Sequence, residues 1–117
     1  MKLILTGNPK SNQHIYQYTC RGRFGVMYMT AVGKKIKSHY IEEIQNQYKE
    51  ELITTELELK VNLYFGDKRK RDVDNYGKLI LDSMNKLVYE DDELIKKITF
   101  EKFYDKQYPR VEVEIIN

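Results

Sequence analysis

The chain has 117 residues, of which 41% are hydrophobic and 32% are charged, and its formal net charge is +2. This composition excludes a disordered polypeptide, and the length fits one domain and is too short for two independent cores. No apolar run is long enough to span a membrane, and the first residues turn polar too early for a secretory signal, so we expect a cytoplasmic protein. The single cysteine, Cys20, cannot form an internal disulfide, and it lacks the neighbouring ligands of a zinc site.

The first part of the chain predicts short strands followed by a long helix. Strand-like segments lie at about 2 to 6, 14 to 20 and 24 to 30, and the turn-forming residues 21 to 23 could be the tip of a hairpin. From Thr30 to about Glu50, apolar side chains recur every three or four residues, and Thr30 is a plausible N-cap. We therefore expect an amphipathic helix between these two residues.

The second half predicts three more strands and a second helix. Residues 57 to 65 alternate strictly between apolar and polar side chains, which is typical of a strand with one buried face. A helix is predicted from about Asp74 to Leu87, and two further alternating runs lie near 98 to 100 and 111 to 115. The expected fold is a single α+β domain, residues 1–117, with a mixed β-sheet and two main helices.

The charges are distributed unevenly along the chain. Residues 1 to 50 carry a net charge of +5 and residues 51 to 117 a net charge of −3. The cations bunch in one run, directly before two aspartates spaced one residue apart: Lys68, Arg69, Lys70, Arg71, then Asp72 and Asp74. Cations bind phosphate and carboxylates bind divalent ions, so the fused pattern predicts a nucleic-acid hydrolase. Each charge run taken alone could equally be a solvated turn.

Asp72 and Asp74 lie where the basic run meets the predicted helix. In extended backbone, side chains two residues apart point the same way, and the free N–H groups of a helix start favour anions. Mg²⁺ keeps several waters, so two or three carboxylates and a phosphate oxygen suffice to bind it. A third carboxylate could come from Asp91 or Asp92 if the flanking strands are neighbours in the sheet.

Structural roles are the alternative for the same residues. Either Asp72 or Asp74 could be a helix N-cap, and Asp91 or Asp92 could start a short helical turn. Lys78 could form a surface ion pair with Asp74, four residues before it. The aromatic side chains of the first third could stack on bases or lie in a subunit interface, but we favour core packing for each of them: Tyr16, Tyr18, Phe24 and Tyr28.

One string of residues resembles a known family. The string is Asp72-Val73-Asp74-Asn75, then Lys78, Asp82, Asn85 and Tyr89-Glu90-Asp91-Asp92, and it is similar to the motifs of the RusA-type Holliday junction resolvases. The resemblance is strong over about residues 61 to 98. It is weaker in the first third, where Pro9-Lys10-Ser11-Asn12 is similar to a Pro-x-Ser-Asn motif of the family. Relatives often have glycine after the residue matching Asn85, where this chain has Lys86.

The resemblance implies a small homodimer that binds four-way DNA junctions by shape and makes paired symmetrical nicks with Mg²⁺, or with Mn²⁺ as a substitute. Carried over by position, the catalytic and metal-binding acids are Asp72, Asp74 and Asp92, with Asp91 the less favoured ligand, and the essential lysine is Lys78. A dimer suits a junction because it can present one active site to each of two equivalent strands.

The basic residues are expected to bind the DNA backbone, which positions the protein without reading sequence. The principal candidates are Lys68, Arg69, Lys70 and Arg71, and the weaker ones are Arg21, Arg23, Lys34, Lys35 and Lys37. Two other functions remain open from the residues alone. One is a non-catalytic nucleic-acid-binding module, and the other is a metal-dependent nuclease that acts on other branched DNA or on RNA.

Overall fold

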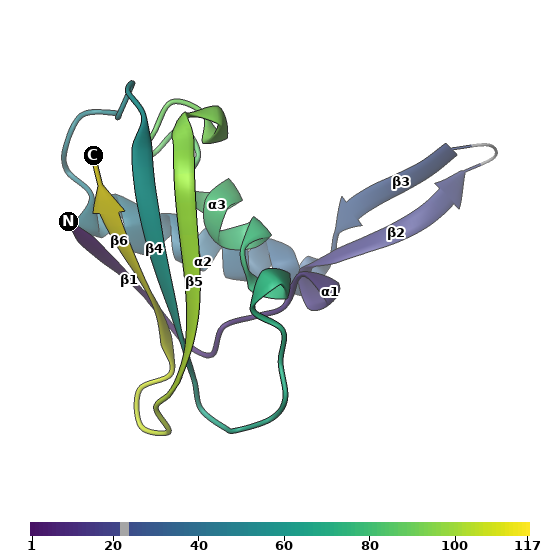
Figure 1. The fold of residues 1–117 in the computed structure, drawn as a ribbon. Helices are drawn as coiled ribbons and strands as arrows, with labels where there is room; N and C mark the ends of the chain where they lie inside the picture. The colour runs from purple at the N-terminus through teal and green to yellow at the C-terminus, as the bar shows by residue number, and fades with distance from the viewer. Residues whose placement is uncertain (22–23) are drawn as a thin grey trace.

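The computed structural model describes residues 1–21 and 24–117 and contains one large and one small sheet (Figure 1). The large sheet has the strand order β1-β6-β4-β5, formed by β1 (Lys2–Thr6), β6 (Arg110–Ile116), β4 (Leu57–Phe65) and β5 (Ile95–Tyr104). β4 runs parallel to β5 and antiparallel to β6, and β6 runs antiparallel to β1. The predicted mixed sheet in an α+β fold is therefore confirmed.

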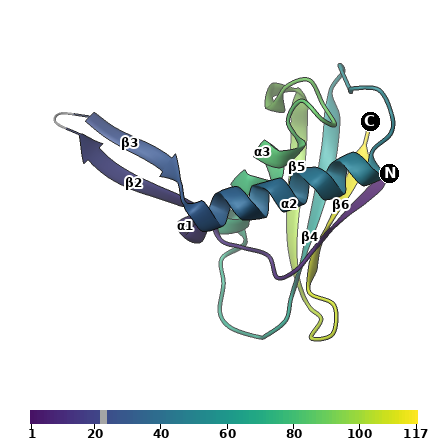
Figure 2. The same cartoon turned by 180° about the vertical axis from the view of Figure 1, so that it is seen from behind.

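The core lies between this sheet and two helices that cover one of its faces. α2 (Ala31–Gln47) and α3 (Lys78–Met84) lie on the same side of the sheet, with α2 crossing the strands in Figure 2. The apolar positions predicted from the alternation in residues 57 to 65 are buried in β4. They meet Tyr40 and Ile44 of α2, which are also buried. None of the described helices is long and apolar enough to cross a membrane.

The long helix begins where the sequence predicts and ends slightly earlier. Thr30 is the N-cap, because its Oγ1 accepts a hydrogen bond from the backbone N–H of Gly33 at 3.0 Å. The helix stops at Gln47 rather than near Glu50, since Tyr48 takes an extended conformation and its hydroxyl donates to the Glu51 carbonyl at 2.7 Å.

The side chains of α2 also close one edge of the sheet. The amide of Gln47 accepts from the Ile4 N–H and donates to the Ile4 carbonyl, both at 2.7 Å. The carboxylate of Glu43 accepts from the Thr6 N–H at 3.0 Å. Three backbone groups at the outer edge of β1, the N–H and carbonyl of Ile4 and the N–H of Thr6, are therefore bonded to helix side chains.

The prediction of one helix from Asp74 to Leu87 is wrong. A 3₁₀-helix, η1 (Val73–Tyr76), precedes α3, and Gly77 lies between them. A side chain at Gly77 would collide with the Phe100 ring, since a Cβ there would lie 2.7 Å from its Cζ. The chain thus needs glycine where η1 and α3 pack closely against β5.

α3 ends at Met84 because the chain turns back at once. Lys86 has a φ of 69°, in the left-handed region, and its N–H donates to the Tyr89 carbonyl at 2.8 Å. Lys86 therefore takes the left-handed conformation at the position where the family that this sequence resembles often has glycine.

The predicted strand at 14 to 20 is wrong in its first two residues. A single helical turn, α1 (Asn12–Ile15), comes first, and β2 (Tyr16–Arg21) then pairs antiparallel with β3 (Phe24–Met29). Ile15 is buried, and its carbonyl accepts from the Thr30 N–H at 2.8 Å. β2 and β3, called the hairpin arm below, project away from the rest of the molecule (Figures 1 and 2).

We expect Lys86→Gly to stabilise the protein. The left-handed conformation costs a residue with a Cβ about 1 kcal/mol, and glycine avoids that cost while losing part of the gain to its larger unfolded-state entropy. A net gain of roughly 0.5 kcal/mol should appear as a higher midpoint in urea unfolding. Lys86→Ala is the control, because alanine keeps the Cβ; equal midpoints for the two variants would contradict this explanation.

Candidate active site and nucleic-acid groove

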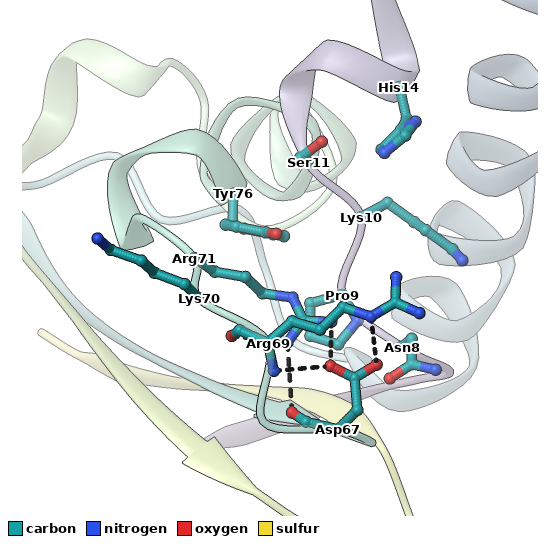
Figure 3. Close-up of a pocket in the computed structure, with 10 residues that line it drawn as sticks. All are labelled: Asn8, Pro9, Lys10, Ser11, His14, Asp67, Arg69, Lys70, Arg71 and Tyr76. Atoms are coloured by element: carbon teal, nitrogen blue, oxygen red, sulfur yellow. Dashed lines mark hydrogen bonds and ion pairs between the residues drawn. The ribbon is translucent and has the colours of Figure 1, made fainter.

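A groove runs between the N-terminal loop and the cationic segment that follows β4 (Figure 3). It consists of two adjoining hollows that share five lining residues: Ser11, His14, Lys70, Arg71 and Tyr76. The first hollow adds Pro9 and Lys10, and the second extends to Asp72. Cationic side chains therefore line a path that ends at the first aspartate of the motif.

The groove brings the Pro9-Lys10-Ser11 segment next to the start of the longer string that resembles RusA-type motifs, of which Asp72 and Asn75 line it. Pro9, Lys10 and Ser11 lie on one wall, and residues 69 to 72 lie on the other. The Asn8 side chain accepts from the Gly66 N–H at 2.9 Å. This bond joins the two loops just after the C-terminal end of β4. Lys10, His14 and Tyr76 had no role in the sequence prediction, because only tertiary contact places them here.

Residues 67 to 71, called the basic loop below, are organised by Asp67. Its carboxylate accepts from the Arg69 N–H at 3.0 Å and pairs with the Arg71 guanidinium at 2.7 Å. The Arg69 N–H and then the Arg71 guanidinium hold the pKa of Asp67 below its ordinary value, so the carboxylate is ionised at neutral pH. In Figure 3 both arginines extend toward this one carboxylate.

The cations of the basic loop differ in their availability for DNA. The side chain of Arg71 is only 17% exposed, and its guanidinium carbon lies 4.3 Å from the centre of the Phe65 ring. Arg69 is 83% exposed, and Lys68 and Lys70 are exposed as well. Arg71 thus holds the loop in shape, while the other three cations face solvent.

Asp72 and Asp74 are both exposed, and Asp72 lines the second hollow of the groove. Asp72 directly precedes η1, yet its side chain makes no capping hydrogen bond within the described structure. Asp72 thus occupies the N-cap position of η1, as the structural alternative expects, but without the capping hydrogen bond of its side chain. The carboxylate remains available for a ligand.

The two aspartates of the later motif differ from each other. Asp91 caps the short 3₁₀-helix η2 (Asp92–Leu94), because its Oδ1 accepts from the Glu93 N–H at 3.1 Å. Oδ1 of Asp92 is buried and has no hydrogen-bond partner among the described residues. A buried carboxylate oxygen without a partner is costly, and a bound cation would satisfy it.

Two asparagines in the resembling motifs share this property. Oδ1 of Asn12 and Oδ1 of Asn85 are also buried without a partner in the part of the chain that the structure describes. Natural proteins pair most buried polar atoms, and exceptions call for an explanation such as an ion, a water or a function. The oxygens of Asn12, Asn85 and Asp92 all belong to residues of the resembling motifs.

Tyr89 lies between Asp92 and the polar side of α3 and is affected by the charges of both regions. Tyr89 is fully buried, and burial, followed by the negative charge of Asp92, raises the pKa of its phenol. The charge of Asp82 acts on the same phenol. Asp82 in turn pairs with Lys78 at 3.2 Å, so polar side chains form a series from Asp92 to Lys78. The predicted alternative of a pair between Lys78 and Asp74 is wrong, because Lys78 pairs with Asp82.

The structure does not gather the three predicted acids into one ready-made site. Among the described residues, no three His, Cys, Asp or Glu side chains converge in a way that could hold a metal ion. Asp92 lies just before the start of β5, whereas the Arg71 carbonyl, next to Asp72, accepts from Lys102 near the other end of that strand at 2.7 Å. A shared metal site for Asp72, Asp74 and Asp92 therefore stays a prediction.

Comparison with known proteins decides the family. The family model described as "Endodeoxyribonuclease RusA" matches residues 6–116. The chain belongs to the RusA family. The resemblance seen in the sequence is thus confirmed, and the match covers both walls of the groove.

Two curated relatives are similar to this RusA-family chain. The "Crossover junction endodeoxyribonuclease RusA" of Aquifex aeolicus (strain VF5) is 30% identical over 108 residues, which are 92% of this chain and 82% of that protein. The "Uncharacterized protein YqaN" of Bacillus subtilis (strain 168) is 48% identical over 46 residues, which are 39% of this chain and 32% of that protein. The chain thus matches about a third of the length of YqaN and most of the Aquifex protein.

The weaker cationic candidates of this RusA-family protein differ in exposure and in their distance from the groove. Lys34 and Lys35 are exposed on the first turns of α2, and Lys35 lines a hollow that adjoins the groove through Lys10. Lys37 is half-buried. The side chain of Arg21 and all of Arg23 lie outside the described part of the structure.

The aromatic side chains of the hairpin arm do not follow the expected core packing. Tyr18 is 71% exposed and Tyr28 is 44% exposed, so the prediction is wrong for both. Tyr16 is half-buried and packs against the core. The side chains of Cys20 and Phe24 fall outside the described residues.

We expect Asp67→Asn to loosen the basic loop. Its four cations are trypsin sites, and loss of the carboxylate removes the ion pair that holds Arg71. Limited digestion at neutral pH should cut the variant faster within residues 68 to 71, since cleavage requires local opening.

Asp105→Asn is the matched control, because Asp105 organises the turn between β5 and β6 in a similar way. It should leave cleavage within residues 68 to 71 unchanged. Equal rates for Asp67→Asn and the unmodified chain would show that Asp67 does not restrain the loop.

Proposed function

We propose that this chain is a divalent-metal-dependent endodeoxyribonuclease that resolves four-way DNA junctions by paired symmetrical nicks. The observation that carries the proposal is the groove in which the basic loop faces the Pro9-Lys10-Ser11 wall and leads to Asp72. The name of the Aquifex relative points to the same substrate.

The substrate backbone would enter along the cations. Arg69, Lys70 and Lys10 line the first hollow, and no acidic residue occurs in the sequence before Glu42. Asp67, which also lines this hollow, is paired with Arg71, so the exposed cations Arg69, Lys70 and Lys10 remain to attract a polyanion and to neutralise its phosphates without regard to base sequence. Such contacts carry no information on base sequence, which is compatible with the proposed recognition of a junction by its shape.

The chemistry of the donors fits Mg²⁺, with Mn²⁺ as a substitute. Asp72, Asp74 and Asp92 would hold the ion, since the Asp72 carboxylate caps no helix and Oδ1 of Asp92 has no partner among the described residues. A bound ion would polarise the scissile phosphate and lower the pKa of a water molecule. Asp91 is less suited because it already caps η2.

The chain's own residues would divide the remaining tasks. The three carboxylates would bind and orient the metal, and the exposed cations of the basic loop would hold the strand in the groove. Lys78 would donate to the scissile phosphate or to the leaving oxygen, where negative charge increases as the bond breaks. The Lys78 side chain is 42% exposed and is thus accessible to a phosphate.

The proposal includes that two copies of the chain act together as a homodimer. A four-way junction offers two equivalent strands, and a two-fold pair of chains can present one active site to each. Paired nicks in one binding event require two such sites.

We expect wild-type protein to nick a labelled synthetic four-way junction in Mg²⁺ and not in EDTA. Asp72→Asn should lower the cleavage rate by at least about a hundredfold, because one ligand of the ion is lost, while junction affinity stays within about twofold. Asp92→Asn should behave in the same way. Glu90→Gln, an exposed neighbour in the same acidic turn, is the control and should cleave normally.

Binding without cleavage in Mg²⁺, unchanged by Asp72→Asn, would instead identify a non-catalytic binding module. Cleavage of flaps, linear duplex or RNA at the same rate as four-way junctions would identify a nuclease with another substrate. Running these substrates side by side separates the outcomes.

Neutralising the exposed cations of the basic loop should weaken DNA binding in a salt-dependent way. Each phosphate contact that is lost should flatten the slope of log K against log salt by about 0.9. The variant replaces Lys68, Arg69 and Lys70 by glutamine, and titrations at several salt concentrations give the slope.

The control for this variant is Lys60→Gln. Lys60 is exposed on β4, between two residues that point into the core, and so lies on the uncovered face of the sheet. The control should keep the wild-type slope. A triple variant with an unaltered slope would remove the basic loop from the DNA interface.

A further inference from the structure

One carboxylate oxygen joins the hairpin arm to the predicted catalytic lysine. Oδ2 of Asp82 accepts from the Tyr16 hydroxyl at 2.6 Å and from the Lys78 ammonium at 3.2 Å. The ammonium also lies 5.0 Å from the centre of the Tyr16 ring. Lys78 therefore has an acceptor on one side and an aromatic face on another.

These contacts are more than an exposed surface ion pair. The Asp82 side chain is only 27% exposed, and the short bond from the phenol is a charge-assisted hydrogen bond. Burial, followed by the bond to Asp82, raises the pKa of Tyr16, so the phenol keeps its proton at neutral pH and remains a donor. A pair between two flexible side chains alone would fix Lys78 much less firmly.

The backbone that carries these groups is well anchored. Lys78 and Asp82 are four residues apart on α3, which buries Leu79 and Ile80 in the core. Tyr16 is the first residue of β2 and pairs with Met29, and both pack against the same core. The three polar groups thus meet where α3 contacts the base of the hairpin arm.

We propose that Asp82 and Tyr16 are positioning residues, which hold the Lys78 ammonium in the orientation required for phosphodiester cleavage. The proposal rests on the proposed function, in which Lys78 donates to the phosphate. Neither residue needs to touch DNA. They act by limiting the positions that the ammonium can take, and small misplacements of a catalytic group are costly in rate.

The test compares two substitutions that keep shape. Asp82→Asn removes the charge, and Tyr16→Phe removes only the hydroxyl. Single-turnover cleavage of a four-way junction should slow by about tenfold or more for Asp82→Asn and by about threefold or more for Tyr16→Phe. Junction affinity should stay within about twofold for both, because neither change removes a phosphate contact.

Tyr48→Phe is the matched control, because it also removes a phenol hydrogen bond, of 2.7 Å to the Glu51 carbonyl, at the far end of α2. It should cleave at the wild-type rate. Thermal unfolding of all three variants checks that each is folded at the assay temperature. A loss of affinity equal to the loss of rate would overturn the positioning role.

A double-mutant cycle with Lys78→Ala tests whether the effects act through the lysine. On that background, Asp82→Asn and Tyr16→Phe should change the cleavage rate no further, since the group that they position is gone. Effects that multiply fully with the effect of Lys78→Ala would overturn the proposal.

A readout without DNA separates this proposal from the proposed function. In protein labelled with ¹⁵N at lysine side chains, nuclear magnetic relaxation should report a restrained Lys78 ammonium in the wild type and a mobile one in both variants. Unchanged mobility overturns the positioning role even if junctions are cut. A wild-type protein that cuts no DNA overturns the proposed function, whatever the relaxation shows.

Discussion

The guanidinium of Arg71 connects the end of β4 to the basic loop. It lies against the Phe65 ring, pairs with Asp67, and donates to the carbonyls of Asp67 and Arg69. A cation that stacks on an aromatic ring and pairs with a carboxylate is strongly restrained. Because Asp72 follows Arg71 directly, this one side chain fixes where the aspartate motif begins, and the groove depends on it.

Neighbouring residues of the same type therefore have different tasks. Arg71 is part of the framework, whereas Arg69 extends into solvent beside it. Asp91 caps a helical turn, whereas Asp92 has a buried oxygen without a partner among the described residues. Local sequence presents Arg69 and Arg71 as equivalent charges, and only the resemblance to a family favoured Asp92 over Asp91. Only burial and hydrogen bonding separate the residue that maintains the fold from the one that is free to bind.

Much of the fold could be predicted because its signals are local. The alternation in residues 57 to 65 and the cap at Thr30 depend on neighbours in the chain, and both elements form as expected. In place of the helix expected from Asp74 to Leu87, the chain forms η1 and α3 with Gly77 between them, and Gly77 lies against the Phe100 ring of a distant strand, a contact that local spacing does not reveal. The missed turn α1 likewise depends on a tertiary contact, the bond from Thr30 to the Ile15 carbonyl.

The candidate site also contains residues that local sequence indicates and residues that only tertiary contacts bring in. Asp72, Asp74 and the basic loop are adjacent in sequence, so their association was visible without a structure. Lys10, His14 and Tyr16 reach the site only through folding, and no spacing in the sequence singles them out. The role of Asp82 was equally hidden, because its position on the polar face of α3 did not indicate which side chain it would hold.

The bonds from Gln47 and Glu43 to β1 have a consequence for the behaviour of the protein in concentrated solution. Strands at the margin of a sheet invite pairing with other copies, and unprotected margins are a frequent origin of aggregation. Here an amide and a carboxylate of a single helix occupy two donors and one acceptor that an incoming strand could otherwise use. Association of copies through this margin would first have to displace both side chains. α2 thus protects the edge of the sheet as well as covering the core.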